Sequence, residues 1–198
     1  MKKSLAVLLS VLLIIALIPT TIADTFSTDN GIKYIVENEE VTIVGYTNAG
    51  KSTLMNAFIE EYSNNEKKIN NKTVLAKDLL FATLDTSSRH IKFKDNKEII
   101  LTDTVGFISK LPHGLIRAFK STLSETLIAD LIILVADISS SDVLNQIQVT
   151  LDTLHEIGVS DETPIIYVFN KADKVGLATI PSNDNKMFIS AKNHLNLK

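Results

Sequence analysis

Residues 45–53 combine the residue types and the spacing that bind a phosphate chain. The run G-Y-T-N-A-G-K-S-T fits the pattern G-x-x-x-x-G-K-S/T. Its glycines let the backbone curl so that N–H groups face the phosphates, and a helix beginning here adds positive partial charge. We expect Lys51 to neutralise the β- and γ-phosphates and the Ser52 hydroxyl to ligate Mg²⁺. The predicted phosphate-binding residues are Gly45, Asn48, Ala49, Gly50, Lys51, Ser52 and Thr53.

A second motif could select the base of a nucleotide. Asn170, Lys171 and Asp173 follow an apolar segment and match N-K-x-D. A carboxylate at Asp173 can accept hydrogen bonds from the N1–H and N2–H₂ groups of guanine, which adenine does not offer, so a pocket of this kind can reject adenine strongly. We expect Asn170 to hold the loop and the N7 side, and the stem of Lys171 to cover the base. Alone, the motif is also typical of an Asn/Asp turn.

Two shorter motifs follow other predicted strands. Asp103 and Gly106 fit D-x-x-G. We expect Asp103 to reach Mg²⁺ through water and the Gly106 N–H to contact the γ-phosphate, so that this loop responds to its loss. Ser190, Ala191 and Lys192 follow the last strand, and the Ala191 N–H is expected to bond guanine O6. Ligands of open α/β sheets lie at the carboxyl ends of strands, where all four motifs fall.

The elements that must position these motifs alternate between strands and helices. Apolar segments predict strands at 41–44, 91–94, 98–102, 131–136, 164–169 and 187–189, with Asp95-Asn96 turning a hairpin between the second and third. Helical patterns cover 52–60, 115–127 and a stretch capped by Ser141 that ends near Gly158. The predicted fold class is α/β: a P-loop GTPase three-layer fold, with a mostly parallel sheet, helices on both faces and one antiparallel hairpin.

Composition and organisation set further limits. The chain has 198 residues, a net charge of −3 and no cysteine, which excludes disulfides and thiolate metal sites and gives no basic surface for DNA. We divide it into a leader at 1–24, a linker at 25–40 and a nucleotide-binding domain at 41–198. The Asn/Lys-rich stretch 61–72 predicts a solvated insertion without fixed structure.

The leader is typical of a secretory signal peptide or signal anchor. Lys2 and Lys3 precede an apolar run at 5–18, and Pro19 breaks it. As a helix this run would span about 21 Å, less than the ~30 Å of a hydrocarbon core, although residues 5–23 are long enough for membrane contact. Export conflicts with chemistry that uses GTP and Mg²⁺, so we expect a cytoplasmic protein and leave membrane association open.

Four blocks of the domain resemble HflX-type GTPases of the Obg–HflX superfamily: 45–53, L-F-A-T-L-D-T at 80–86, L-T-D-T-V-G-F-I at 101–108 and K-L-P-H-G-L at 110–115. The resemblance covers about 41–192 and implies GTP and GDP binding with Mg²⁺ and association with the large ribosomal subunit. It also implies that Thr83, rather than Thr86, closes on Mg²⁺ and the γ-phosphate. We expect the leader to stand in place of the domain that contacts ribosomal RNA in that family, and the helix that normally follows S-A-K to be missing or nearly so. We therefore expect weak ribosome binding at most and an apolar sheet face left exposed.

Catalysis is expected to be slow. Phe107 stands where many GTPases have a glutamine that orients water, and we expect Arg89 and His113 to have structural roles. Hydrolysis would then depend on Lys51, Thr83, Gly106 and Mg²⁺. Asn48 is similar to an asparagine that ligates K⁺ in potassium-activated GTPases such as the MnmE family, and the alternative is a hydrogen bond within its own loop. Alternative functions are a guanine-nucleotide-binding module without hydrolysis and a non-functional truncated or fused gene product.

Overall fold

The computed structural model describes residues 39–62, 87–93, 98–107, 124–176 and 185–197. Six strands form one sheet in the order β2-β3-β1-β4-β5-β6, and only the β2–β3 pair is antiparallel. The strands are β1 (Glu39–Gly45), β2 (Ser87–Lys92), β3 (Glu98–Asp103), β4 (Leu131–Asp137), β5 (Ile165–Asn170) and β6 (Lys186–Phe188). The helices are α2 (Lys51–Tyr62), α4 (Ser124–Leu127), α5 (Val143–Ile157) and the 3₁₀ turn η2 (Ala172–Val175).

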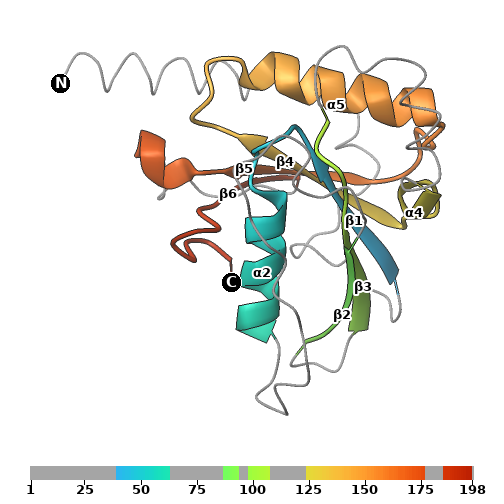
Figure 1. The fold of residues 1–198 in the computed structure, drawn as a ribbon, viewed down its shortest axis with the longest axis horizontal. Helices are drawn as coiled ribbons and strands as arrows, with labels where there is room; N and C mark the ends of the chain where they lie inside the picture. The colour runs from blue at the N-terminus through green and yellow to red at the C-terminus, as the bar shows by residue number, and fades with distance from the viewer. Residues whose placement is uncertain (1–38, 63–86, 94–97, 108–123, 177–184, 198) are drawn as a thin grey trace.

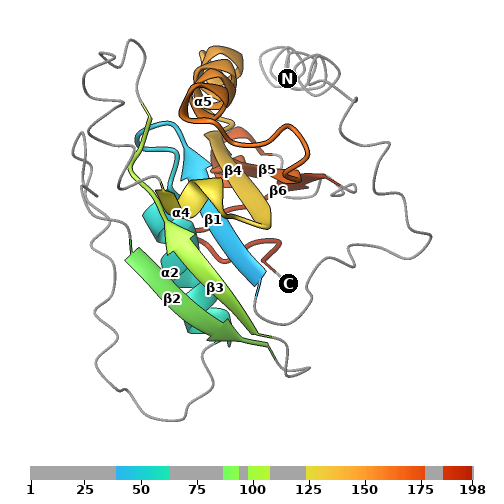
Figure 2. The ribbon, with the colours of Figure 1, turned by 90° about the vertical axis from the view of Figure 1, so that its right-hand side faces the viewer.

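Helices cover both faces of the sheet, with α5 over one face and α2 over the other (Figures 1 and 2). The alternation of side chains along β4 explains why that strand reads as a continuous apolar run. Ile132, Leu134 and Ala136 pack with the α5 side of the core, whereas Leu131, Ile133 and Val135 pack with the α2 side. Both faces of a parallel strand are buried in this arrangement, so neither needs polar residues. The predicted α/β fold class, with one antiparallel hairpin, is confirmed.

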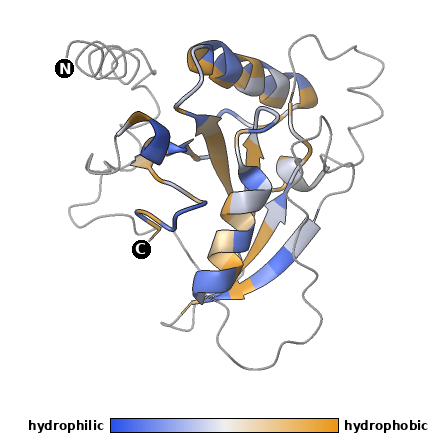
Figure 3. Cartoon of the chain, turned by 60° about the vertical axis from the view of Figure 1, so that its left-hand side comes forward, coloured by the Kyte–Doolittle hydropathy of each residue, from blue (hydrophilic) through white to orange (hydrophobic). Residues whose placement is uncertain are grey.

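Helix α5 presents one apolar side to the sheet and a polar side outward, as its alternating colours show (Figure 3). Val143, Ile147 and Leu154 are buried against β4 and β5. The helix ends where predicted, because Gly158 adopts φ 99° and its N–H closes onto the carbonyls of Leu154 and His155.

The beginning of α5 differs from the prediction. The residue that precedes its first turn is Asp142, not Ser141, and it makes no side-chain capping hydrogen bond. The Oγ of Ser140 instead accepts hydrogen bonds from the Asp142 N–H and the Gln146 amide. The predicted cap at Ser141 was wrong because a neighbouring serine already satisfies donors of this turn.

Three other boundaries were misplaced. Strand β1 begins at Glu39, inside the predicted linker, because Glu39 and Glu40 lie opposite Ile99 and Ile100 of β3. Helix α2 runs to Tyr62, so the first two residues of the predicted insertion are helical. Strand β2 begins at Ser87, four residues before the predicted start, because pairing with β3 extends it beyond its apolar part.

On the α2 face, apolar side chains line a groove of about 300 Å³ between α2, the sheet and the C-terminal residues. Phe58 and Tyr62 of α2 stand on one side of it and Met187 and Leu197 lie on another. The Tyr62 hydroxyl donates a hydrogen bond of 3.0 Å to the carbonyl of Leu197, which fixes the end of the described chain beside the groove. The expectation that an apolar sheet face is left exposed stays a prediction.

Several predictions fall outside the described residues: the leader and most of the linker, residues 63–72 of the insertion, the Asp95-Asn96 turn, Thr83, Thr86, His113 and most of the predicted helix at 115–127, of which α4 is the described end. Among the helices of the described ranges, none combines the length and apolar character needed to span a membrane.

Candidate functional site

The four motifs meet at one edge of the sheet. The motifs follow β1, β3, β5 and β6, which end at Gly45, Asp103, Asn170 and Phe188, and with β4 between them these strands are all parallel. The site therefore lies at the carboxyl ends of the central strands, which is where open α/β sheets bind their ligands.

Two glycines shape the loop between β1 and α2. A Cβ on Gly45, at φ 151°, would lie 2.2 Å from the carbonyl oxygen of Val135, and one on Gly50, at φ 100°, would lie 2.2 Å from Nδ2 of Asn170. Both positions thus need glycine for space as well as for backbone conformation. Asn48 adopts φ 60°, a left-handed conformation that asparagine tolerates better than most residues.

Lys51 begins α2 and is buried, with 6% of its surface exposed. Its Nζ donates hydrogen bonds of 3.2 Å to the carbonyls of Gly45 and Tyr46. Burial lowers the pKa of Lys51 to about 8, and the nearby Asp103 carboxylate opposes this shift. An ammonium held against the phosphate loop and short of charged partners is well suited to an incoming anion.

Asp103 and Ser52 form the part of the site suited to a metal ion. The Ser52 hydroxyl donates a hydrogen bond of 2.6 Å to Oδ2 of Asp103, and Oδ1 of the same buried carboxylate has no partner among the described residues. Burial raises the pKa of Asp103, although the bond from Ser52 and the charge of Lys51 counteract this. A hydroxyl beside an unsatisfied carboxylate oxygen fits Mg²⁺, which takes hard oxygen ligands and keeps several waters.

Within the described ranges, no group of three or more His, Asp or Glu side chains could hold a metal by itself. A metal at Ser52 and Asp103 would thus need oxygens from a phosphate chain and water, which suits a nucleotide-bound Mg²⁺ more than a free-standing metal centre.

The D-x-x-G loop lies directly against the phosphate loop. The Thr47 N–H donates to the carbonyl of Phe107 at 2.8 Å, and the Phe107 N–H donates to the carbonyl of Gly45 at 3.1 Å. A Cβ on Gly106 would lie 2.8 Å from Cα of Thr47 and 3.0 Å from Nζ of Lys51. Only glycine at position 106 therefore lets this loop approach the phosphate site so closely.

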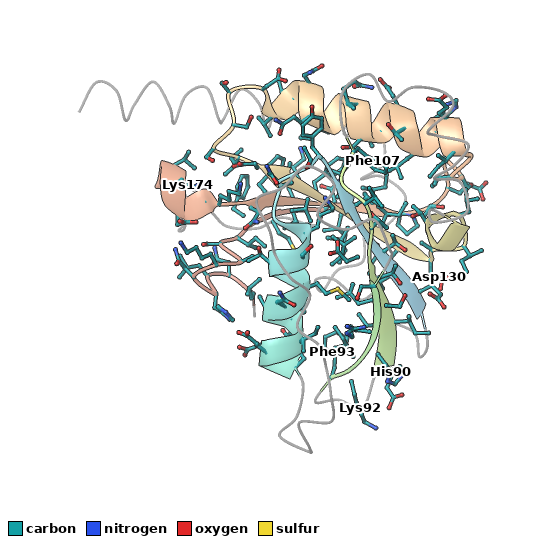
Figure 4. The ribbon with its side chains drawn as sticks, viewed as in Figure 1. His90, Lys92, Phe93, Phe107, Asp130 and Lys174 are labelled. Carbon is teal, nitrogen blue, oxygen red and sulfur yellow. The ribbon has the colours of Figure 1, made fainter. Side chains whose placement is uncertain are left out.

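The Phe107 ring lies in the core on the α5 side and is 3% exposed (Figure 4). A buried phenyl ring offers no hydrogen bond to water. The residue after D-x-x-G thus anchors the loop by packing, and any ordering of an attacking water must come from other groups.

Asn170 joins three loops. Its Nδ2 donates to the carbonyl of Ala49 at 3.0 Å, while its Oδ1 accepts from the N–H groups of Lys171 at 2.8 Å and Ala191 at 3.0 Å. Asn170 is buried, whereas Asp173 in η2 is exposed. Since Ala191 already donates to Asn170, its bond to guanine O6 stays a prediction, as does the bond of Asp173 to the base.

Asp137 is a charged residue of the site that the sequence motifs missed. It ends β4, and its Oδ2 lies 2.7 Å from Nζ of Lys171, while its Oδ1 accepts bonds from the N–H and hydroxyl of Ser139. Burial opposes ionisation of Asp137, but the hydrogen bonds from Lys171 and Ser139 together lower its pKa below the ordinary value. The signal that could have found it is the one that found Asp103: a carboxylate directly after an apolar strand.

The remaining residues predicted for the site differ in burial and in the element that carries them. Ser190 is buried and exchanges backbone hydrogen bonds with Leu195, and Lys192 is exposed. Arg89 lies in β2, an edge strand that β3 separates from β1. Thr53 follows Ser52 in α2, and Thr83 lies outside the described residues.

Comparison with known proteins agrees with this geometry. The chain is 47% identical over 158 residues to GTPase HflX of Caldanaerobacter subterraneus and 45% identical over 133 residues to GTPase HflX of Escherichia coli. These alignments cover 79% and 67% of this chain but 34% and 28% of the relatives, so the chain spans about a third of their length. A GTP-binding protein of Sulfolobus solfataricus, solved in complex with GDP, is 31% identical with a TM-score of 0.56, over 79% of this chain and 48% of that one.

The model of the family described as 50S ribosome-binding GTPase matches residues 40–171. That range begins in β1 and ends within the base-selecting motif, so it includes the phosphate loop, the D-x-x-G loop and Asn170. The chain belongs to this family of GTPases.

Proposed function

We propose that this chain binds GTP and GDP with Mg²⁺ and slowly hydrolyses GTP. The observation that carries the proposal is the 3.0 Å hydrogen bond from Asn170 to the carbonyl of Ala49. It joins the loop that suits a phosphate chain to the loop that suits guanine, so that one nucleotide can occupy both. Membership of a GTPase family supports the same conclusion.

The reaction would depend on positioning and charge rather than on covalent chemistry. Lys51 would leave the carbonyls of Gly45 and Tyr46 for the β- and γ-phosphates. The Gly106 N–H would bond the γ-phosphate, and the family resemblance implies that Thr83 would close on Mg²⁺ and the γ-phosphate. Mg²⁺, held through Ser52 and through water on Asp103, would supply further charge neutralisation.

Potassium is proposed as a second cation. Asn48 is exposed, and its side chain makes no hydrogen bond to any described residue, although its carbonyl accepts one from Lys171. This favours a ligand role over the alternative of a bond within its own loop. A cation there would neutralise charge that builds between the β- and γ-phosphates, where an arginine finger acts in other GTPases.

We further propose where the chain acts and which partners it has. The chain is proposed to act in the cytoplasm, where GTP and Mg²⁺ are available, and to associate weakly at most with the large ribosomal subunit. Its net charge of −3 argues against broad contact with DNA or RNA backbones. Contact with a membrane through residues 5–23 is a further proposal, and N-terminal sequencing of the protein recovered from separated cell fractions would test it.

The test of nucleotide binding is calorimetry with GDP, GTP, ATP and xanthosine diphosphate. The chain should bind GDP and GTP and ignore ATP, and Lys51→Ala should abolish binding. Asp173→Asn should move preference toward xanthine, because the C2 carbonyl of xanthine needs a donor where guanine needs an acceptor. Equal affinity of the unsubstituted chain for ATP and GTP would contradict the proposal. Single-turnover phosphate release would then separate a GTPase from a binding module without hydrolysis.

A further inference from the structure

One ion pair of the site is not explained by any of the four motifs. Nζ of Lys171 lies 2.7 Å from Oδ2 of Asp137, and the side chains of the two residues are only 25% and 19% exposed. An ion pair on the open surface contributes little to stability because water and salt screen it. This pair is shielded for most of its surface, so its removal should have a measurable effect on whatever Lys171 does.

The same ammonium also contacts the phosphate loop. Nζ of Lys171 donates a hydrogen bond of 2.8 Å to the carbonyl of Asn48, the residue at φ 60°. The backbone of Lys171 is itself left-handed, at φ 64°, and its N–H is held by Oδ1 of Asn170. Lys171 is therefore fixed at both ends, and its stem spans the distance between the base-selecting loop and the phosphate loop.

Asp137 is held in place by bonds that do not involve Lys171. Its Oδ1 accepts a hydrogen bond of 2.9 Å from the N–H of Ser139 and a second from the Ser139 hydroxyl. The carboxylate thus has one oxygen committed to its own loop and the other aimed at Lys171. A preorganised partner of this kind restrains a long, flexible lysine, which would otherwise sample many rotamers.

We propose that Asp137 is a positioning residue that sets how long guanine nucleotides stay bound, by holding the Lys171 side chain extended against the phosphate loop. The proposal rests on the nucleotide binding proposed above. Without the carboxylate, the Lys171 side chain can move away from the carbonyl of Asn48. It then covers the base less well and no longer supports the phosphate loop. A charge-assisted hydrogen bond in such a setting corresponds to about tenfold in an equilibrium or rate constant.

The experiment measures release of a fluorescent GDP analogue from the full chain by stopped flow. Asp137→Asn keeps the size of the side chain and an acceptor for Ser139 but removes the charge. It should release GDP about tenfold faster than the unsubstituted chain. The matched control is Asp142→Asn, an exposed carboxylate that begins α5 and bonds only Asn145 through its side chain, and it should release GDP as the unsubstituted chain does.

A double-mutant cycle with Lys171→Met separates positioning from a general loss of stability. If Asp137 acts through Lys171, the double variant should release GDP no faster than Lys171→Met alone. If Asp137→Asn also lowers the melting temperature, the same comparison shows whether faster release comes from lost stability or from Lys171, since the double variant leaves no unpaired charge. Equal release by Asp137→Asn and the unsubstituted chain, or additive effects in the cycle, would overturn the inference. Failure of the unsubstituted chain to bind the GDP analogue would instead refute the proposed function.

Discussion

The burial of Lys51 predicts a pH dependence of nucleotide affinity. In the free protein its pKa is about 8, because the ammonium is buried against the carbonyls of Gly45 and Tyr46. Phosphate groups next to Lys51 favour its charged form and so raise the pKa in the complex. Above pH 8 the free protein must therefore take up a proton in order to bind, and affinity should fall as the pH rises.

The magnitude follows from the fraction of free protein that carries the charge. With a pKa of about 8, Lys51 is about 90% charged at pH 7 and about 10% charged at pH 9. The dissociation constant for GDP should accordingly rise about tenfold between these two pH values, and about 0.9 protons should be taken up per GDP at pH 9.

Calorimetry in buffers of different ionisation enthalpy measures both quantities. Lys51→Arg provides the control, since arginine keeps its charge over this range and should remove the proton uptake even if affinity drops. A dissociation constant that does not change between pH 7 and pH 9, with no proton uptake at pH 9, would show that Lys51 is charged throughout and that the reasoning from burial is wrong.

Three further predictions concern the cation site, the core and the ribosome. Hydrolysis should be faster in KCl than in NaCl at equal ionic strength, and Asn48→Ala should abolish the difference; equal rates in both salts for the unsubstituted chain would exclude a potassium ligand at Asn48. Phe107→Ala should lower the free energy of unfolding, measured by urea denaturation, by about 3–4 kcal/mol, because it leaves a cavity at a buried site. Leu144→Ala, at a residue that is 38% exposed, should lower it by less than about 1 kcal/mol. Similar losses for both variants would refute the anchoring role of Phe107. Light scattering should detect no GTP-dependent splitting of ribosomes by this chain, and separation of subunits at sub-micromolar protein would contradict the expectation from its charge and short match to the relatives.

The fold and the outline of the site could be predicted because they depend on local patterns. The apolar run of β4 can form only a strand buried on both faces, and Gly45, Gly50, Lys51 and Ser52 carry their chemistry in their spacing. The hairpin of β2 and β3 and the left-handed end of α5 at Gly158 are likewise local events. Such features need no knowledge of distant residues, since the short-range geometry of the chain is enough.

Contacts between distant segments could not be predicted in this way. The start of β1 depended on pairing with β3, which extends the strand into acidic residues. The sequence pattern alone indicates a linker at Glu39 and Glu40, because hydrogen bonds between segments contribute nothing to local periodicity.

The sequence by itself determined that a phosphate loop, a D-x-x-G loop and a guanine-selecting motif each follow a strand, because those motifs are short and contiguous. Only the tertiary structure decided that Asn170 supports Ala49, that Phe107 turns into the core, and that Asp137 meets Lys171 beside Asn48. Asp137 ends β4 and Lys171 directly follows β5, and the pairing of these two strands brings the residues together. The strength of their interaction depends on a distance and a degree of burial that arise only when the strands are assembled in the sheet.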